Sequence, residues 1–206
     1  NDFTWKDFQA RNNNELVAIL GNFVNRALVL TKKYYNGVVP EAGELTDYDR
    51  DTIAELSGIK ASLESNIENY RFRDALKEAM QLARVGNKYL TETEPWKLIK
   101  TDESRVATIL NVCLQITANC GIIFEPFLPF SAAKIMKMLK LETAKWSDAG
   151  NIGIMAVGKE IGQPELVFRK IEDAEVDAQI EKVKAAKAAR EAEEALNAPV
   201  APQKET

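Results

Sequence analysis

The stretch NELVAILGNFVNRALVLTKKYYNG, from Asn14 to Gly37, decides how the chain folds. Its apolar residues step by four and three positions, which is the spacing of one face of an α-helix. They are Leu16, Leu20, Phe23, Ala27, Leu30 and Tyr34. This face predicts a helix that packs on a core. A second, more polar stripe lies on another side of the same helix and contains Ala18, Asn22, Asn25, Arg26, Val29 and Lys33.

Asn22 and Arg26 stand out within the polar stripe because they are four residues apart. At that spacing their side chains lie one turn above the other and point the same way. The plainer interpretation is a solvated face. The alternative is a surface that presents an amide and a guanidinium to a partner. The helix alone leaves both interpretations open.

Further helices are predicted beyond Gly37, separated by breaks that proline, glycine and asparagine mark. Their expected ranges are 46–69, 72–90, 102–124 and 131–141. The sequence Thr46-Asp47-Tyr48-Asp49 fits a capping box at the start of the first of them. A short aromatic element over 2–13 precedes the opening helix, whose expected N-cap is Asn13 or Asn14.

The last third of the chain loses the helical period. Four glycines over 142–172 indicate an irregular or short-stranded segment, and the Ala-, Glu- and Lys-rich stretch from Glu175 predicts an exposed helix that frays into a linker. The predicted fold is therefore all-α: a bundle of four to five helices with its extension over 1–172, then a charged helical linker over 173–206.

A sharp corner is predicted in TETEPWKLIK (91–100). Pro95 cannot donate a backbone hydrogen bond inside a helix, so the chain turns there. Trp96 then falls in the first turn of a new short helix. A tryptophan at such a corner either closes the core or presents its ring to a partner.

The residues of catalytic and metal sites are missing from this sequence. It holds no histidine, and its two cysteines, Cys113 and Cys120, lie seven positions apart in a helical pattern. Their Cα atoms are then about 10 Å apart, too far for a disulfide, and burial as small hydrophobes is the expected state. Without histidine or a CxxC motif we expect no zinc site, no catalytic residue and no bound cofactor in this chain.

The charge is unevenly distributed. Residues 172–206 hold nine acidic and five basic residues, which equals the whole net charge of −4, and residues 1–171 hold 22 of each. A neutral body argues against non-specific gripping of phosphates, and so against DNA, but allows recognition of a few unstacked RNA bases. We find no uncharged apolar run of about 18 residues and no signal peptide, so we expect a cytoplasmic protein without a membrane.

Four local patterns, taken in order, resemble one family. They are DFQARNNNELVAILGNFVNR (7–26), NKYLTETEPWKLIK (87–100), ANCGIIFEPFLPFSAAKI (118–135) and ELVFRKIE (165–172). Together they are similar to the anticodon-binding domain of bacterial methionyl-tRNA synthetases. The resemblance covers about 1–172, and the order of the four matches makes it specific.

The resemblance implies roles for individual residues. Asn22 and Arg26 match the two residues, on one helix, that hydrogen-bond anticodon bases in this family. Trp96 matches the aromatic residue that stacks on the first anticodon base, and Pro95 matches the residue that sets the corner. Lys33, Arg84 and Lys88 are candidate phosphate contacts, with an ordinary solvated face as the alternative for each. The implied partner is the CAU anticodon loop of methionine tRNA.

The resemblance also implies a longer parent enzyme. Its catalytic domain, with the ATP motifs, magnesium and any zinc, is expected upstream of Asn1, so the chain is expected to be a non-catalytic fragment of an ATP-dependent methionine–tRNA ligase. The Glu175–Thr206 stretch resembles the linker to a C-terminal tRNA-binding module that dimerises some members. Two alternatives stay open: the anticodon-binding bundle of another class I synthetase, and a helical protein-interaction module, in which Asn22, Arg26 and Trp96 would be far apart or buried.

Overall fold

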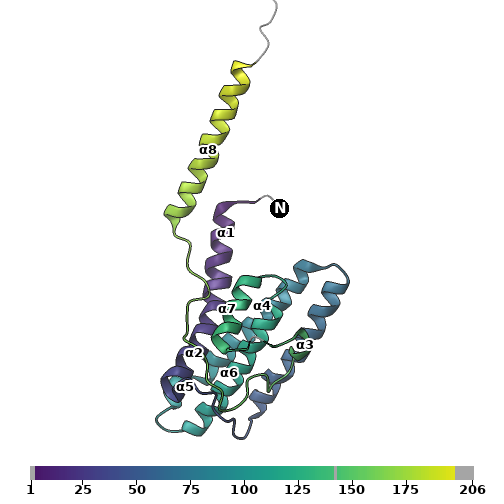
Figure 1. Cartoon of the computed structure of the whole chain (residues 1–206), viewed down its shortest axis with the longest axis vertical. Helices are drawn as coiled ribbons and strands as arrows, with labels where there is room; N and C mark the ends of the chain where they lie inside the picture. The colour runs from purple at the N-terminus through teal and green to yellow at the C-terminus, as the bar shows by residue number, and fades with distance from the viewer. Residues whose placement is uncertain (1–2, 142, 198–206) are drawn as a thin grey trace, which may run out of the picture. The chain divides into compact units, whose positions relative to one another are not determined.

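The computed structural model describes residues 3–141 and 143–197 (Figure 1). The chain divides into two compact units, one made of residues 14–169 and the other of the residues up to 13 with those from 170 on. The division at residue 172 that the sequence suggested stays a prediction about domains.

The larger unit is a helical bundle, as predicted. Its helices are α2 (Asn22–Tyr35), α3 (Asp47–Glu68), α4 (Phe72–Thr93), the single-turn α5 (Pro95–Leu98), α6 (Glu103–Ile123) and α7 (Pro129–Leu139). Helix α7 begins two residues earlier than expected because Pro129 is well suited to a first helical turn. The described residues contain no strand, only an isolated antiparallel bridge between Val38 and Glu160. The all-α prediction is confirmed.

Helix α6 is the centre of the bundle (Figure 1). It packs against α2, α3, α4, α5 and α7, and every residue from Thr108 to Ile123 is buried. By length and composition an 18-residue window of α6 could cross a membrane, but 94% of this window is buried inside the protein. The expectation that the sequence lacks an uncharged run of this length is therefore wrong for residues 106–123, and a central position in the bundle accounts for that uncharged sequence.

Three amide side chains on α6 hold irregular backbone: two bind the segment that follows α7, and one binds the loop between α2 and α3. Gln115 Oε1 accepts the backbone N–H groups of Gly153 (3.0 Å) and Met155 (2.9 Å), and its Nε2 donates to the Met155 carbonyl (2.8 Å). Asn119 Oδ1 accepts the Gly150 N–H at 2.6 Å, and Asn111 Nδ2 donates to the Pro40 carbonyl at 2.7 Å. The row of Asn111, Gln115 and Asn119, four residues apart, is called the amide row below. It satisfies backbone groups that have no helix or sheet of their own.

The predicted N-cap of the opening helix is wrong. A helix, α1 (Trp5–Arg11), already begins after Thr4, whose Oγ1 accepts the Asp7 N–H at 3.1 Å, and a π-helical segment, η1 (Asn12–Gly21), precedes α2. The Asn13 side chain does not cap a helix. Its Nδ2 donates to the Ile171 carbonyl and its Oδ1 accepts the Ile171 N–H, both at 2.9 Å. A partner far along the chain therefore uses the group that local sequence assigned to a cap.

The smaller unit contains α1 and α8 (Asp173–Leu196). Gln9 Nε2 donates to the Ile171 carbonyl (3.0 Å) and to Asp173 Oδ1 (2.8 Å), and Val176 is buried. The rest of α8 is mostly exposed, as expected for the charged helix predicted from Glu175. The part of the predicted linker beyond residue 197 lies outside the described residues.

Candidate functional site

Polar side chains of α2 face polar side chains of α4. Asn22 Nδ2 donates to Asn87 Oδ1 at 3.0 Å, and Arg26 Nη1 donates to Thr91 Oγ1 at 3.4 Å. Asn87 and Thr91 are four residues apart on α4, like Asn22 and Arg26 on α2, so one helical turn of each helix is matched with one turn of the other. These four residues together with Trp96 are called the polar row below.

Gly86 lets the two helices approach closely enough for these contacts. A Cβ atom at this position would lie 2.5 Å from Cζ of Phe23, a side chain that is fully buried. Real Cβ atoms do not come so close to a ring, and the ring itself has no flexible end that could move away. The glycine is therefore required by the packing of α2 on α4, beside the Asn22–Asn87 hydrogen bond.

The predicted corner is present and brings Trp96 to the polar row. Helix α4 ends at Thr93, Glu94 adopts the left-handed region (φ 43°), and the buried Pro95 opens α5. Trp96 is half-buried, and the Arg26 guanidinium carbon lies 4.7 Å from the centroid of its ring. That geometry is a cation–π contact. Arg26 and Trp96 thus meet at one place, and Asn22 lies one turn before Arg26.

A buried carboxylate fixes this end of α4. Asp49, at the start of α3, accepts two hydrogen bonds from the Arg105 guanidinium, at 2.5 and 2.8 Å, and one from the Tyr89 hydroxyl at 2.6 Å. Burial alone would raise the pKa of Asp49, but the hydrogen bonds from Arg105, Tyr89 and the Thr46 backbone lower it to about 2. Tyr89 lies on α4 between Asn87 and Thr91, so the network holds the segment that carries half of the polar row.

The three candidate phosphate contacts lie in different settings. Arg84 and Lys88 are one turn apart on α4 and exposed, and Arg84 Nη2 lies 3.6 Å from Glu15 Oε2. Lys33 is exposed in the last turn of α2, with its Nζ 5.3 Å from the Tyr34 ring centroid. Arg84 and Lys88 therefore share one helix with Asn87 and Thr91, whereas Lys33 lies more than one turn beyond Arg26 on α2.

The chemistry available at the polar row is hydrogen bonding and stacking. One of the five N–H groups of Arg26 bonds to Thr91, and the planar fork can donate others to the edge of a base. Within the described residues no group of three or more His, Cys, Asp or Glu side chains could hold a metal. Both cysteines are free and buried, and burial raises the pKa of each thiol. The described residues do not fit a zinc site.

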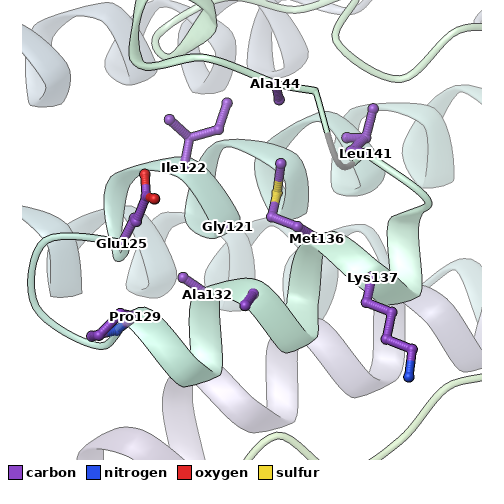
Figure 2. A pocket seen from close by; sticks show the side chains of 10 residues that line it. Gly121, Ile122, Glu125, Pro129, Ala132, Met136, Lys137, Leu141 and Ala144 are labelled. Atoms are coloured by element: carbon purple, nitrogen blue, oxygen red, sulfur yellow. The ribbon is translucent and has the colours of Figure 1, made fainter.

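A pocket of about 360 Å³ lies elsewhere on the bundle (Figure 2). Its lining comes from α6, the α6–α7 loop, α7 and the segment after α7, with no residue from α2, α4 or α5. Figure 2 shows Glu125 and Lys137 at opposite ends, with Met136 between them. A Cβ atom on Gly121 would collide with the Met136 sulfur, so the pocket wall is close-packed there. The pocket is separate from the polar row.

Sequence analysis missed several residues of this site. Asn87 and Thr91 stand eight and four residues before Pro95, and their shared spacing with Asn22 and Arg26 was the only available signal. Asp49 was assigned a role in the capping box alone. The capping box is present, but Arg105 and Tyr89 are 56 and 40 residues away in sequence, and no local pattern joins them.

Comparison with known proteins agrees with this architecture. Residues 39–188 match a family described as the anticodon binding domain of methionyl tRNA ligase, and residues 1–28 match the class I tRNA synthetases (M). The first match contains Pro95 and Trp96, and the second contains Asn22 and Arg26.

Individual relatives point the same way. The chain is 60% identical to a methionine–tRNA ligase of Phocaeicola vulgatus over 90% of this chain and 27% of the relative. It is also 60% identical to that of Porphyromonas gingivalis over 98% of this chain and 30% of the relative. A crystal structure of Mycobacterium tuberculosis methionyl-tRNA synthetase in its free state shares the fold, with a TM-score of 0.75 and 25% identity over 82% of this chain and 35% of that one. The chain thus spans less than a third of the length of these curated relatives.

Proposed function

The chain belongs to the family of anticodon-binding domains of methionyl-tRNA ligases, and from this premise we propose that it recognises the CAU anticodon of methionine tRNA. The parent enzyme would then charge that tRNA with methionine in an ATP-dependent ligase reaction. The residues proposed to bind the anticodon are Asn22, Arg26 and Trp96, with Pro95 setting the position of Trp96.

The contact between Arg26 and Trp96 carries the proposal. The guanidinium carbon lies 4.7 Å from the centre of the indole ring, at a corner that Pro95 and the left-handed Glu94 define. A flat aromatic surface beside a planar donor suits a base that has left its stack, because the ring takes the face of the base and the guanidinium takes its edge. Such stacking contributes about 1–3 kcal/mol per base.

The polar row supplies further hydrogen bonds to the loop. Asn22 donates one amide N–H to Asn87, which leaves its side-chain oxygen as an acceptor for a base. An asparagine can accept from one base group and donate to another, so replacing its partner Asn87 by a base edge exchanges one hydrogen bond for another. The two helices hold these groups in fixed register, which favours discrimination between bases.

The two alternative functions receive less support. A helical protein-interaction module would have Asn22, Arg26 and Trp96 far apart or buried, whereas Arg26 contacts both Thr91 and Trp96. The anticodon-binding bundle of another class I synthetase conflicts with the family assignment over residues 39–188.

Binding of this chain to two RNA hairpins tests the proposal. One is an anticodon stem-loop with the sequence CAU, and the other has its first anticodon base changed. We expect tighter binding of the CAU hairpin, because Trp96 and Arg26 contact that base. Equal affinity of the two hairpins would contradict the proposal.

Two substitutions assign the effect to residues. Trp96→Ala and Arg26→Ala should each weaken binding of the CAU hairpin by about tenfold, since each removes about 1–2 kcal/mol of stacking or edge contact. Trp96→Phe keeps an aromatic face and should restore part of the affinity. Arg50→Ala is the matched control, because Arg50 is exposed and its guanidinium bonds to groups nearby in the sequence, the Asp47 carboxylate and the Leu45 carbonyl. Circular dichroism verifies that each variant is folded.

The remaining parts of the proposal concern the whole enzyme. ATP, magnesium and any zinc are proposed to be held by the catalytic part of the same polypeptide, as the resemblance to methionyl-tRNA synthetases implies. Lys33, Arg84 and Lys88 are proposed phosphate contacts. The proposed location is the cytoplasm, and a homodimer formed through a C-terminal tRNA-binding module is proposed on the resemblance of 175–206 to a linker.

A further inference from the structure

The turn between α3 and α4 carries an unusual set of exposed side chains. Its sequence is NYRFR, residues 69–73, which we call the α3–α4 tip. Tyr70 is 81% exposed and Phe72 is 56% exposed, and their ring centroids lie 6.2 Å apart with the planes at 89°. Two large aromatic rings therefore contact each other and the solvent instead of the core.

The backbone of Tyr70 is strained. Its φ of 58° lies in the left-handed region, where the Cβ atom of a bulky residue is crowded and where glycine or asparagine is normally found. The C-cap of α2 illustrates the usual solution, since Asn36 occupies it with a φ of 52°. The conformation of Tyr70 closes α3: the Tyr70 N–H donates to the Ile67 carbonyl at 2.9 Å and the Arg71 N–H to the Asn66 carbonyl at 2.8 Å, as in a Schellman motif. A tyrosine at this position still costs stability relative to glycine or asparagine, and its exposed ring recovers little by burial. Strain of this kind concentrates at functional positions.

The charge at the tip is positive and available. Arg71 and Arg73 are exposed, and neither guanidinium forms a hydrogen bond or an ion pair with a residue of 3–141 or 143–197. The neighbouring carboxylate, Asp74, already accepts a hydrogen bond from Lys77 Nζ at 2.9 Å. Two arginines interleaved with two aromatic rings match the chemistry of RNA, which offers phosphates to the guanidinium groups and unstacked bases to the rings.

The tip is also placed where a bound RNA can reach it. Arg73 stands 18 residues before Thr91 on α4, which is five helical turns and a distance of about 27 Å along the axis. After five whole turns Arg73 lies on the same side of α4 as Thr91, and Arg84 lies close to that side as well. An RNA whose loop sits on the polar row and whose stem follows α4 would meet the tip.

We propose that the α3–α4 tip is a second RNA contact, which binds the tRNA outside its anticodon. Arg71 and Arg73 hold backbone phosphates, and the Tyr70 ring stacks on a base that is not paired. This inference rests on the proposed anticodon recognition, because the polar row sets the position of the loop. The tip adds affinity for the tRNA body and none for the anticodon sequence.

The charge contribution is tested with Arg71→Gln/Arg73→Gln in this chain. We expect the double variant to bind a complete CAU tRNA about tenfold more weakly, and its plot of log affinity against log salt to lose a slope of about one to two. Lys6→Gln/Lys182→Gln is the matched control, since it removes the same charge from exposed sites on α1 and α8. The control should bind as the unchanged chain does.

The contribution of the ring is tested with Tyr70→Asn, which removes the ring and suits the left-handed backbone. We expect the melting temperature to rise while the affinity for complete tRNA falls about tenfold. A merely structural role would not separate these two effects. Phe130→Asn is the control, because Phe130 is 90% exposed on a different helix, α7, and its loss should leave binding unchanged.

A second RNA separates this proposal from the proposed function. Every tip variant should lower the affinity for CAU tRNA and for a tRNA with a changed first anticodon base by the same factor. None should change the affinity for a hairpin that is too short to span 27 Å. If the unchanged chain does not discriminate the two tRNAs but the tip variants weaken both, anticodon recognition fails and the tip contact stands. If the tip variants bind complete tRNA normally, the proposal is overturned, and a protein surface becomes the better partner for the tip.

Discussion

A non-glycine residue with a left-handed backbone lies just beyond each end of helix α4, and the surroundings of these two residues differ. After its last turn, Glu94 (φ 43°) is followed by the buried Pro95 and forms an ion pair with Lys97 at 2.7 Å. Before its first turn, Tyr70 (φ 58°) is exposed, and its ring contacts that of the exposed Phe72. One strained residue lies within a packed corner, and the other stands in solvent.

The comparison separates two kinds of surface. At the corner, buried groups such as Tyr89 and Asp49 determine where the polar row and Trp96 lie, so the surface is fixed before any ligand binds. At the tip, backbone hydrogen bonds to the last turn of α3 fix the main chain, whereas the Tyr70, Arg71 and Phe72 side chains are exposed. A fixed surface fits the proposed discrimination between bases, and exposed side chains fit the proposed contact with a backbone.

The largest expected difference between the two ends follows from the buried ion pair. Arg105→Met leaves the Asp49 carboxylate without its bidentate partner at a position that is completely buried. We expect a loss of about 3–5 kcal/mol in the free energy of unfolding, measured by urea denaturation. Arg73→Met at the tip should change it by less than about 0.5 kcal/mol. Similar losses at the two positions would remove the distinction between a packed and an unpacked end.

The next effect concerns the close approach of α2 and α4. Gly86→Ala places a Cβ atom against the Phe23 ring and should cost about 2–3 kcal/mol by overpacking. The variant should also bind the CAU hairpin more weakly, because the movement of α2 away from α4 separates Asn22 from Asn87. Gly58→Ala on α3 is the matched control: nothing lies within 4 Å of its Cβ position, so we expect a gain of about 0.5–1 kcal/mol. A stable Gly86→Ala variant with normal binding would contradict this account.

The pH dependence of stability should also reflect the corner. The hydrogen bonds to Asp49 lower its pKa from 3.8 to about 2 in the folded state. Their contribution is fully present above pH 3.8 and is lost as the pH falls towards 2, a change of about 2 kcal/mol. The free energy of unfolding of the unchanged chain, minus that of Asp49→Asn, should fall by this amount between pH 5 and pH 2. A difference that stays constant over this range would be inconsistent with the depressed pKa.

The smallest expected effect compares the two strained residues directly. Tyr70→Asn should stabilise the fold by about 1 kcal/mol, which raises the melting temperature by about 2–4 °C for a chain of this size. Glu94→Asn should gain less, because it also removes the contact with Lys97. The two melting temperatures measure this difference. An equal gain at both ends would show that the surroundings of Glu94 do not offset its strain.

Much of the fold could be predicted because the evidence for it is local. The capping box at Thr46, the break near Asn69 and the corner at Pro95 each depend on neighbouring residues, and the structure has all three. The start of the first helix was mispredicted because Asn13 binds Ile171, 158 positions later. The periodicity of α6 marked it as a helix but could not indicate that its amides hold a distant backbone.

The candidate site divides in the same way. Asn22, Arg26, Pro95 and Trp96 were found by their spacing and by resemblance, and the structure brings Arg26 onto Trp96. Asn87, Thr91, Tyr89 and Arg105 were not found, because their roles depend on how helices pack across 40 to 65 positions. The tip was missed for another reason: its sequence marks a turn, but only the backbone angle and exposure of Tyr70 reveal its strain.

The amide row has a consequence for the order in which the chain folds. Gln115 and Asn119 bond to backbone groups 31 to 40 positions later, beyond the end of α7. Closing loops of that length is entropically unfavourable, so these bonds form only after the local helices exist. During synthesis, Gln115 and Asn119 on α6 therefore lack these backbone partners until the segment around Gly153 has left the ribosome. The irregular segment completes the bundle, although it contains almost no regular structure.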